Sequence, residues 1–155
     1  MPFQSSHASS ADAALSEVKA VYQDLSTSAI HRNCTLVGEC CQFKLTGKIP
    51  HLTRGEALFA AKALRASGRK KVPESPSGAC PLLNPATSRC MVYESRPFGC
   101  RTHFCNAAGG PYSRKEVTDL VHRLEAVDAL LGGGGPRSLP GALEEGMLDF
   151  EAARR

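Results

Sequence analysis

Seven cysteines lie within one stretch of the chain, and no other feature limits its possible folds so strongly. They form two groups: Cys34, Cys40 and Cys41, then Cys80, Cys90, Cys100 and Cys105. An odd number of cysteines cannot all pair within one chain, and disulfides are rare in reducing compartments. Thiolate sulfur is a soft ligand that selects zinc, Cu(I) or iron–sulfur clusters. The sequence therefore favours metal binding, and all seven cysteines are candidate ligands.

The length of 155 residues indicates one domain, and its core should be modest because Trp is absent and aromatic residues make up only 6% of the chain. A bound metal would help to stabilise such a core. The net charge is +4, but no nucleic-acid-binding motif or set of stacking aromatics accompanies it. We expect no nucleic-acid partner, and a protein partner stays open.

The N-terminal residues MPFQSSHASSADAAL lack the basic segment and apolar stretch of a signal peptide. No apolar run reaches the roughly 18 residues that a membrane span needs. We therefore expect a cytoplasmic protein with reduced thiols and no membrane partner.

Apolar residues recur at spacings of three and four in several segments, which predicts a mostly α fold. The helices are expected at about residues 10–30, 53–68, 113–131 and, more weakly, 140–153. Two of them should begin at capping boxes, Thr53–Glu56 and Ser113–Glu116. The fold class expected is a small single domain of three to four helices around a loop-rich cysteine metal-binding core.

Three regions follow from this pattern. They are a disordered N-terminus (1–10), a cysteine-cluster metal-binding domain (11–131), and a Gly-rich linker with a C-terminal helix (132–155). The glycines at 132–135 follow a helix, so they indicate a linker or helix stop and not a phosphate loop. The later cysteine region is rich in turn formers, with MVYE at 91–94 as a short strand or helical turn. We expect metal ligation, and not packing, to order it.

The cysteine spacing argues against an ordinary zinc finger, because the chain contains no C-x2-C. Cys40 and Cys41 are adjacent, and side chains of adjacent residues diverge. The pair is thus poorly placed to bind one ion together. Either the two serve different sites, or one alone is a ligand, or both bind a multinuclear cluster.

The later half carries a specific resemblance. Cys80-Pro81, Cys90-x2-Tyr93 and Arg96-Pro97-x2-Cys100-Arg101-x3-Cys105 resemble the YkgJ, or CxxCxxCC, family over roughly residues 30–110. Its members are small proteins described as zinc- or iron-chelating or as containing an iron–sulfur cluster, and a related domain occurs in flagellin lysine-N-methylase. The resemblance implies iron–sulfur or zinc as the cofactor. No S-adenosylmethionine site is visible, so we do not extend the methylase activity to this chain.

The earlier half departs from the family pattern of eight cysteines, because Val37 stands at the second cysteine position. Seven cysteines cannot complete two four-thiolate zinc sites, but four remain for one zinc ion or one [4Fe–4S] cluster. His31 or His103 could complete a second site, although a position beside the site suits His103 better. We expect sulfurs from both halves to converge.

Other residues of the motif have two interpretations each. Arg96 and Arg101 flank Cys100, where they could offset thiolate charge or fix a turn and an ion pair. Tyr93 could line a pocket, but core packing suits it better.

Three functions remain open. One is an iron–sulfur redox or electron-transfer module, to which the cysteine pair and Cys80-Pro81 point. The second is a non-catalytic structural or interaction protein that binds zinc. The third is a thiol redox sensor, which would need an exposed thiolate near a cation. No nucleophile elbow, HExxH or kinase signature is present, so the sequence leaves open whether the chain is an enzyme.

Overall fold

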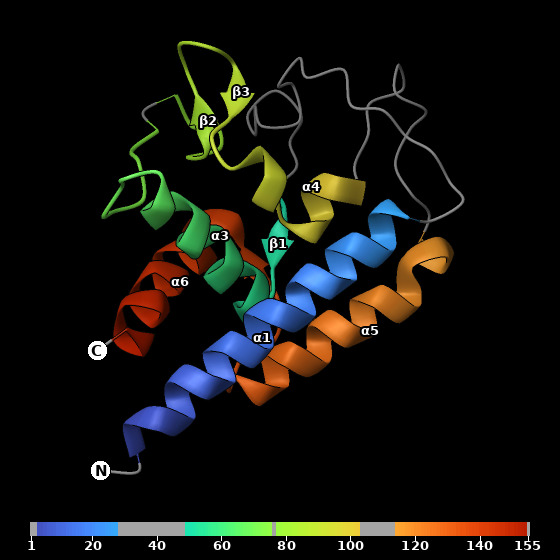
Figure 1. Ribbon diagram of the computed structural model, residues 1–155. Helices are drawn as coiled ribbons and strands as arrows, with labels where there is room; N and C mark the ends of the chain where they lie inside the picture. Colours follow the sequence, from blue (N-terminus) through green and yellow to red (C-terminus); the bar gives the residue numbers. More distant parts are fainter. Residues whose placement is uncertain (1–2, 28–48, 76, 103–113, 155) are drawn as a thin grey trace.

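The computed structural model describes residues 3–27, 49–75, 77–102 and 114–154. Within them the chain forms a small, mostly helical domain, which confirms the expected fold class (Figure 1). The helices are α1 (Phe3–Ser26), α3 (Arg54–Ala66), α4 (Phe98–Thr102), α5 (Arg114–Leu130), α6 (Leu139–Ala153) and the 3₁₀ helix η2 (Tyr93–Ser95). The strands are β1 (His51–Leu52), β2 (Leu83–Asn84), β3 (Arg89–Cys90) and β4 (Arg137–Ser138).

Helix α1 carries the predicted apolar stripe, and Val18, Tyr22 and Leu25 on it are buried. It begins at Phe3 and not near Ser10, so it covers most of the segment whose composition suggested disorder. Extending an existing helix gains one hydrogen bond per residue, and Ala is the best helix former.

Helix α3 begins at the predicted capping box. Thr53 is the N-cap, its side-chain oxygen accepts from the Glu56 backbone N–H, and the Glu56 carboxylate accepts from the Thr53 N–H at 2.9 Å. At the other end Gly68 has φ +92°, a left-handed conformation that suits a residue without Cβ. Both helix signals read from the sequence are confirmed.

Helices α1 and α5 lie side by side and antiparallel, and α6 packs against α3 (Figure 1). Gly146 of α6 lies so close to α3 that a Cβ there would come within 2.5 Å of the Ala57 carbonyl oxygen. On α5, Val117, Leu124 and Val127 are buried as predicted, whereas the expected cap at Ser113 lies outside the described residues. None of these helices is long and apolar enough to span a bilayer, as far as the described residues extend.

A two-stranded antiparallel sheet joins the start of α3 to the start of α6. Strand β1 pairs with β4 in the register His51↔Ser138 and Leu52↔Arg137. The Leu139 N–H then donates to the Pro50 carbonyl at 2.9 Å. The sequence did not predict these strands, because two residues cannot display an alternating pattern.

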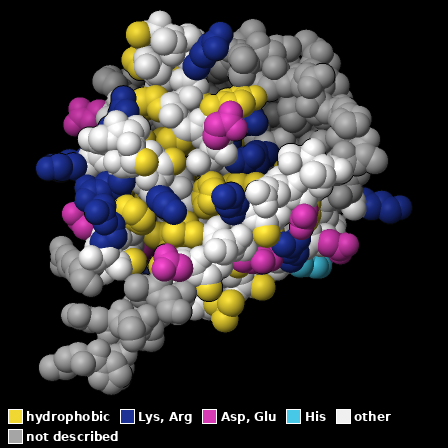
Figure 2. Space-filling model, in the orientation of Figure 1, with side chains coloured by type: hydrophobic (Ala, Val, Ile, Leu, Met, Phe, Trp, Pro, Cys, Tyr) yellow, Lys and Arg dark blue, Asp and Glu magenta, His cyan; other side chains and the backbone are white. Residues whose placement is uncertain are grey.

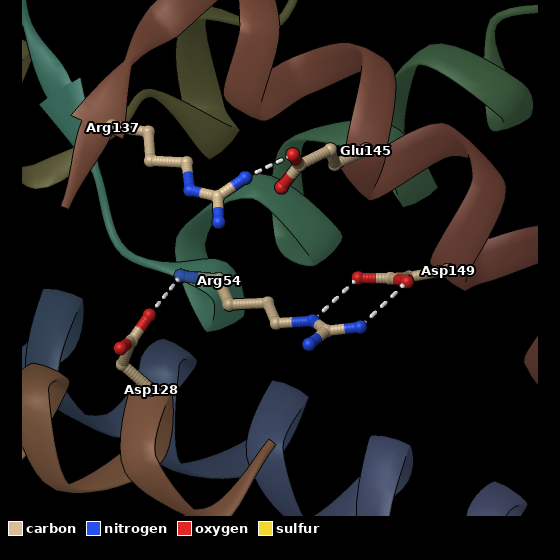
Figure 3. A network of polar contacts seen from close by, with 5 residues as sticks. All are labelled: Arg54, Asp128, Arg137, Glu145 and Asp149. Carbon is tan, nitrogen blue, oxygen red and sulfur yellow. Dashed lines mark hydrogen bonds and ion pairs between the residues drawn. The ribbon is translucent and has the colours of Figure 1, made fainter. Parts of the chain in front are cut away.

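Polar contacts reinforce the same junction (Figure 3). The Arg54 backbone N–H donates to Asp128 of α5 at 2.8 Å, and its guanidinium donates twice to Asp149 of α6, at 2.9 and 3.1 Å. Hydrogen bonding to Asp149 raises the pKa of Arg54. Arg137 forms an ion pair with Glu145. Arg54 thus connects the N-terminus of α3 to two other helices.

The apolar core has two main parts. One lies between α3, α6 and the β2–β3 hairpin, and the other lies between α1, α5 and α4. The first includes four buried residues of the later cysteine region, Cys80, Leu82, Leu83 and Val92, together with Ala79 just before it. The expectation that packing does not order this region is therefore wrong. Its short elements have no core of their own, but they share the core of the helices.

Candidate metal centre

The β2–β3 hairpin positions Cys80 and Cys90. Leu83 of β2 is paired with Cys90 of β3, and the Leu83 N–H donates to the Cys80 carbonyl at 3.0 Å. The Asn84 side chain accepts from the Ala86 N–H at 2.9 Å and so begins the turn. Leu83 therefore links the two cysteines through the backbone, because it is hydrogen-bonded to Cys80 and paired with Cys90.

Burial differs between these two cysteines. Cys80 is 4% exposed and belongs to the apolar core, whereas Cys90 is half-buried and packs against that core. The MVYE segment follows: Val92 enters the core, and the chain then turns into η2. The predicted helical turn is thus present, from Tyr93 to Ser95.

Cys100 lies on α4, the short helix that follows Pro97. The Cys100 N–H donates to the Pro97 carbonyl at 3.0 Å, and Phe98 and Pro97 are both buried. The Phe98 N–H has no partner within so short a helix, and it donates to the Glu56 carboxylate of α3 at 2.6 Å. One side chain of α3 therefore caps the helix that carries Cys100.

Glu56 is 3% exposed and accepts hydrogen bonds from three separate segments. Its Oε1 accepts from the Phe98 N–H and from the Tyr22 hydroxyl of α1 at 3.3 Å, and its Oε2 accepts from the N–H and hydroxyl of Thr53. Burial raises the pKa of Glu56, and these hydrogen bonds oppose that effect. The capping box in the sequence predicted only the contact of Glu56 with Thr53, because Tyr22 and Phe98 are far away in the sequence.

Arg101 connects Cys100 to the same group of residues. Its guanidinium lies over the Tyr22 ring, 4.0 Å from the centroid, and donates to the carbonyls of Arg96 and Glu94 at 2.6 Å each. Burial lowers the pKa of Arg101, although the nearby Cys100 thiol is one of the groups that raise it. Burial also raises the pKa of Tyr22 well above its usual value, and Glu56 adds to this. Arg101 thus both fixes the chain and lies within electrostatic reach of a thiol.

Arg96 has a structural role within the described part of the chain. It donates to the Tyr93 carbonyl at 3.0 Å, and its guanidinium lies 3.9 Å from the centroid of the Tyr93 ring. These contacts support the interpretation that Arg96-Pro97 fixes a turn, although the partners are a carbonyl and a ring and not a carboxylate.

The remaining candidate ligands lie outside the described residues. They are Cys34, Cys40, Cys41, Cys105, His31 and His103, and Val37 lies there as well. Among the residues that are described, no three His, Cys, Asp or Glu side chains are grouped so that they could hold a metal ion. The described part of the chain therefore does not bring Cys80, Cys90 and Cys100 together as one metal site, and the expected convergence of the two halves stays a prediction.

The donor set nevertheless fits a thiophilic metal. Cys80, Cys90 and Cys100 supply the soft sulfur that zinc and iron–sulfur clusters select. The fold and this donor set define a small helical domain with cysteines on a hairpin and on a short helix.

The family comparison agrees with this class. Residues 33–121 match the CxxCxxCC family, described as a "putative zinc- or iron-chelating domain", and the chain belongs to this family. The match includes the cysteine-bearing segments and extends into α5, further than the resemblance in the motif suggested. No curated protein and no solved structure matches the chain.

Proposed function

We propose that this metal-binding protein holds an iron–sulfur cluster on its cysteines and serves as a redox or electron-transfer module in the cytoplasm. One observation carries the proposal. The segments that bear Cys80, Cys90 and Cys100 are anchored by the apolar core and by Glu56, so packing and hydrogen bonding contribute to their position. A metal bound to segments that are already anchored in this way is better explained by its chemistry than by a structural role alone.

The sequence supports iron–sulfur over a single zinc ion. Cys40 and Cys41 are adjacent and diverge from one another, which suits a multinuclear cluster better than one ion. The Cys80-Pro81 step is similar to the Cys-Pro that ends bacterial ferredoxin motifs. A cytoplasmic location would keep the thiols reduced and available.

A structural or interaction role for zinc is the second candidate. It is favoured by the family description, which names zinc together with iron, and by the burial of Cys80, since closed structural sites exclude solvent. A thiol redox sensor is the third candidate, and the proximity of Arg101 to Cys100 supports it.

Anaerobic purification followed by a visible spectrum and elemental analysis separates these candidates. We expect brown protein that contains iron and acid-labile sulfide, and a Cys100→Ser variant should lose both. A Glu144→Gln variant is the control, because Glu144 is exposed and distant in sequence from every cysteine. Colourless protein with stoichiometric zinc would overturn the iron–sulfur proposal, and folded protein without metal would favour the thiol sensor.

A further inference from the structure

A groove separate from the polar junction of Figure 3 opens between α1, α3 and the segment that runs from β3 to η2. Its volume is about 580 Å³, within the range of ligand-binding sites. Its lining includes Lys19 of α1, Phe59 and Lys62 of α3, and Cys90, Val92 and Tyr93 of the later segment. Residues from three parts of the sequence therefore form one concave surface.

The floor of the groove is apolar. Phe59 and Ala63 come from α3 and are partly buried, whereas Val92 is 5% exposed. Figure 2 shows hydrophobic side chains interspersed with Lys and Arg on this face of the molecule. Apolar surface gathered in a hollow and rimmed by polar groups is typical of an interaction site.

The rim of the groove is basic. Lys19 of α1 and Lys62 of α3 are both exposed, and neither forms an ion pair with any of the described residues. Arg96 adds a third positive charge, because its guanidinium lies over the Tyr93 ring that lines the groove. Among the described residues of the lining, Glu94 is the only acidic one, so positive charge predominates there.

We propose that this groove is a docking site for an acidic segment of a partner protein, with apolar side chains in the floor and carboxylates beside Lys19 and Lys62. The lysines come from different helices, so they suit a segment that crosses from α1 to α3. Nucleic acid fits less well, because Arg96 already covers one face of the Tyr93 ring where a base would stack.

The position of Cys90 gives this docking site a role in the proposed function. Cys90 lines the groove and is a candidate metal ligand, so a docked segment would lie against the metal centre. The idea that the groove brings a redox partner to the metal centre rests on the proposed function. Docking of an acidic segment through charge and apolar contacts does not rest on it. The two are tested separately by measuring binding to both metal-free and metal-loaded protein.

A random peptide library displayed on phage, selected against the full-length protein, tests the proposal. We expect the selected peptides to combine Asp or Glu with aliphatic or aromatic residues. Synthetic copies should bind wild-type protein in fluorescence anisotropy, and a Lys19→Glu/Lys62→Glu variant should weaken binding at least about tenfold. The control, Lys70→Glu/Lys71→Glu, makes the same charge change at two exposed residues outside the groove and should change binding less than about twofold.

Each outcome decides for or against the groove. Equal weakening in both double variants, or selection of peptides without acidic residues, would overturn the proposal, as would tight binding of a single-stranded oligonucleotide but of no peptide. Docking that persists in metal-free protein would support the groove even if the iron–sulfur proposal failed. Circular dichroism of both variants verifies that the surface substitutions leave the fold intact.

Discussion

Glu56 shows how one residue can serve the helix that it begins and a distant segment of the chain. It completes a capping box on α3, and it also caps the helix that carries Cys100 and binds the Tyr22 hydroxyl. All four hydrogen bonds of its carboxylate come from donors, which an ionised carboxylate can satisfy.

Replacing Glu56 by Gln should therefore destabilise the protein. An amide has one oxygen and one NH₂ group, so the NH₂ would face the N–H of either Phe98 or Thr53 and leave a buried donor unsatisfied. We expect Glu56→Gln to lower the free energy of unfolding by about 1–3 kcal/mol in urea titrations at neutral pH. The exposed Glu144→Gln should change it by less than about 0.5 kcal/mol. Equal effects of the two substitutions would contradict this role for Glu56.

The same residue predicts a pH dependence. Burial raises the pKa of Glu56 above its usual value of 4.5, so the unfolded chain releases this proton at lower pH than the folded chain. The part of the folding stability that is linked to this proton is then complete below pH 4.5 and is lost as pH rises through the folded-state pKa, whereas the hydrogen bonds to the carboxylate remain. The difference in free energy of unfolding, wild type minus Glu56→Gln, should fall over this range. A difference that increases with pH would show that the pKa is lowered instead.

The sequence predicts the contact between Glu56 and Thr53, but not the contacts of Glu56 with residues far away in the sequence. A capping box is visible because Thr53 and Glu56 are three residues apart, at a spacing fixed by helix geometry. The bond from Phe98 depends on how α3 and α4 meet, and no local pattern specifies that. The same holds for Arg101, whose contact with Tyr22 requires α1 to be in place.

At the scale of elements, apolar spacing predicted the long helices because each has one buried stripe and one exposed face. It located α3 and α5 closely, but placed the start of α1 too late because Ser and Ala give no apolar signal. It missed β1 and β4, whose residues are ordered by pairing with one another. The sequence did not predict the β2–β3 hairpin or α4 for a similar reason, because these elements are positioned by packing against the helices.

The contact between α3 and α6 gives a prediction with an internal control. A Cβ at Gly146 would lie 2.5 Å from the Ala57 carbonyl oxygen, whereas a Cβ at Gly141 on the same helix would meet no atom within 4 Å. Gly146→Ala should cost about 1–3 kcal/mol, because backbone must move to admit the methyl group. Gly141→Ala should be neutral or stabilising by up to about 1 kcal/mol. Urea unfolding measures the change in free energy of unfolding for both variants. Similar changes would mean that α3 and α6 can move apart to admit the methyl group.

At the scale of the whole molecule, the helical scaffold and the candidate metal centre are distinct in what holds them together. Among the described residues, the apolar clusters include two cysteines, Cys80 and Cys90, and are otherwise built from side chains of the helices, the short strands and the segments between them. The sequence predicted thiolate chemistry from the number and spacing of cysteines. It could not predict that Cys80 and Cys90 would pack into the core of the helices, because that depends on tertiary contacts.

Metal removal should therefore leave the fold largely intact. We expect metal-loaded protein treated with a chelator to lose its metal and keep most of its helical signal in far-UV circular dichroism. Leu64→Ala is the comparison, because Leu64 is fully buried in α3 and its truncation should cost about 2–5 kcal/mol. Loss of the helical signal on chelation would show that the metal holds the scaffold together.

The pairing of β1 with β4 has a consequence for the kinetics of folding. His51 and Ser138 are partners, yet α3, the hairpin, α4 and α5 all lie between them in the sequence. Closing so long a loop costs entropy before any contact compensates it, so this pair should form late, after the helices. Substitutions in β4 should then accelerate unfolding with little effect on the folding rate, as expected for contacts absent from the transition state.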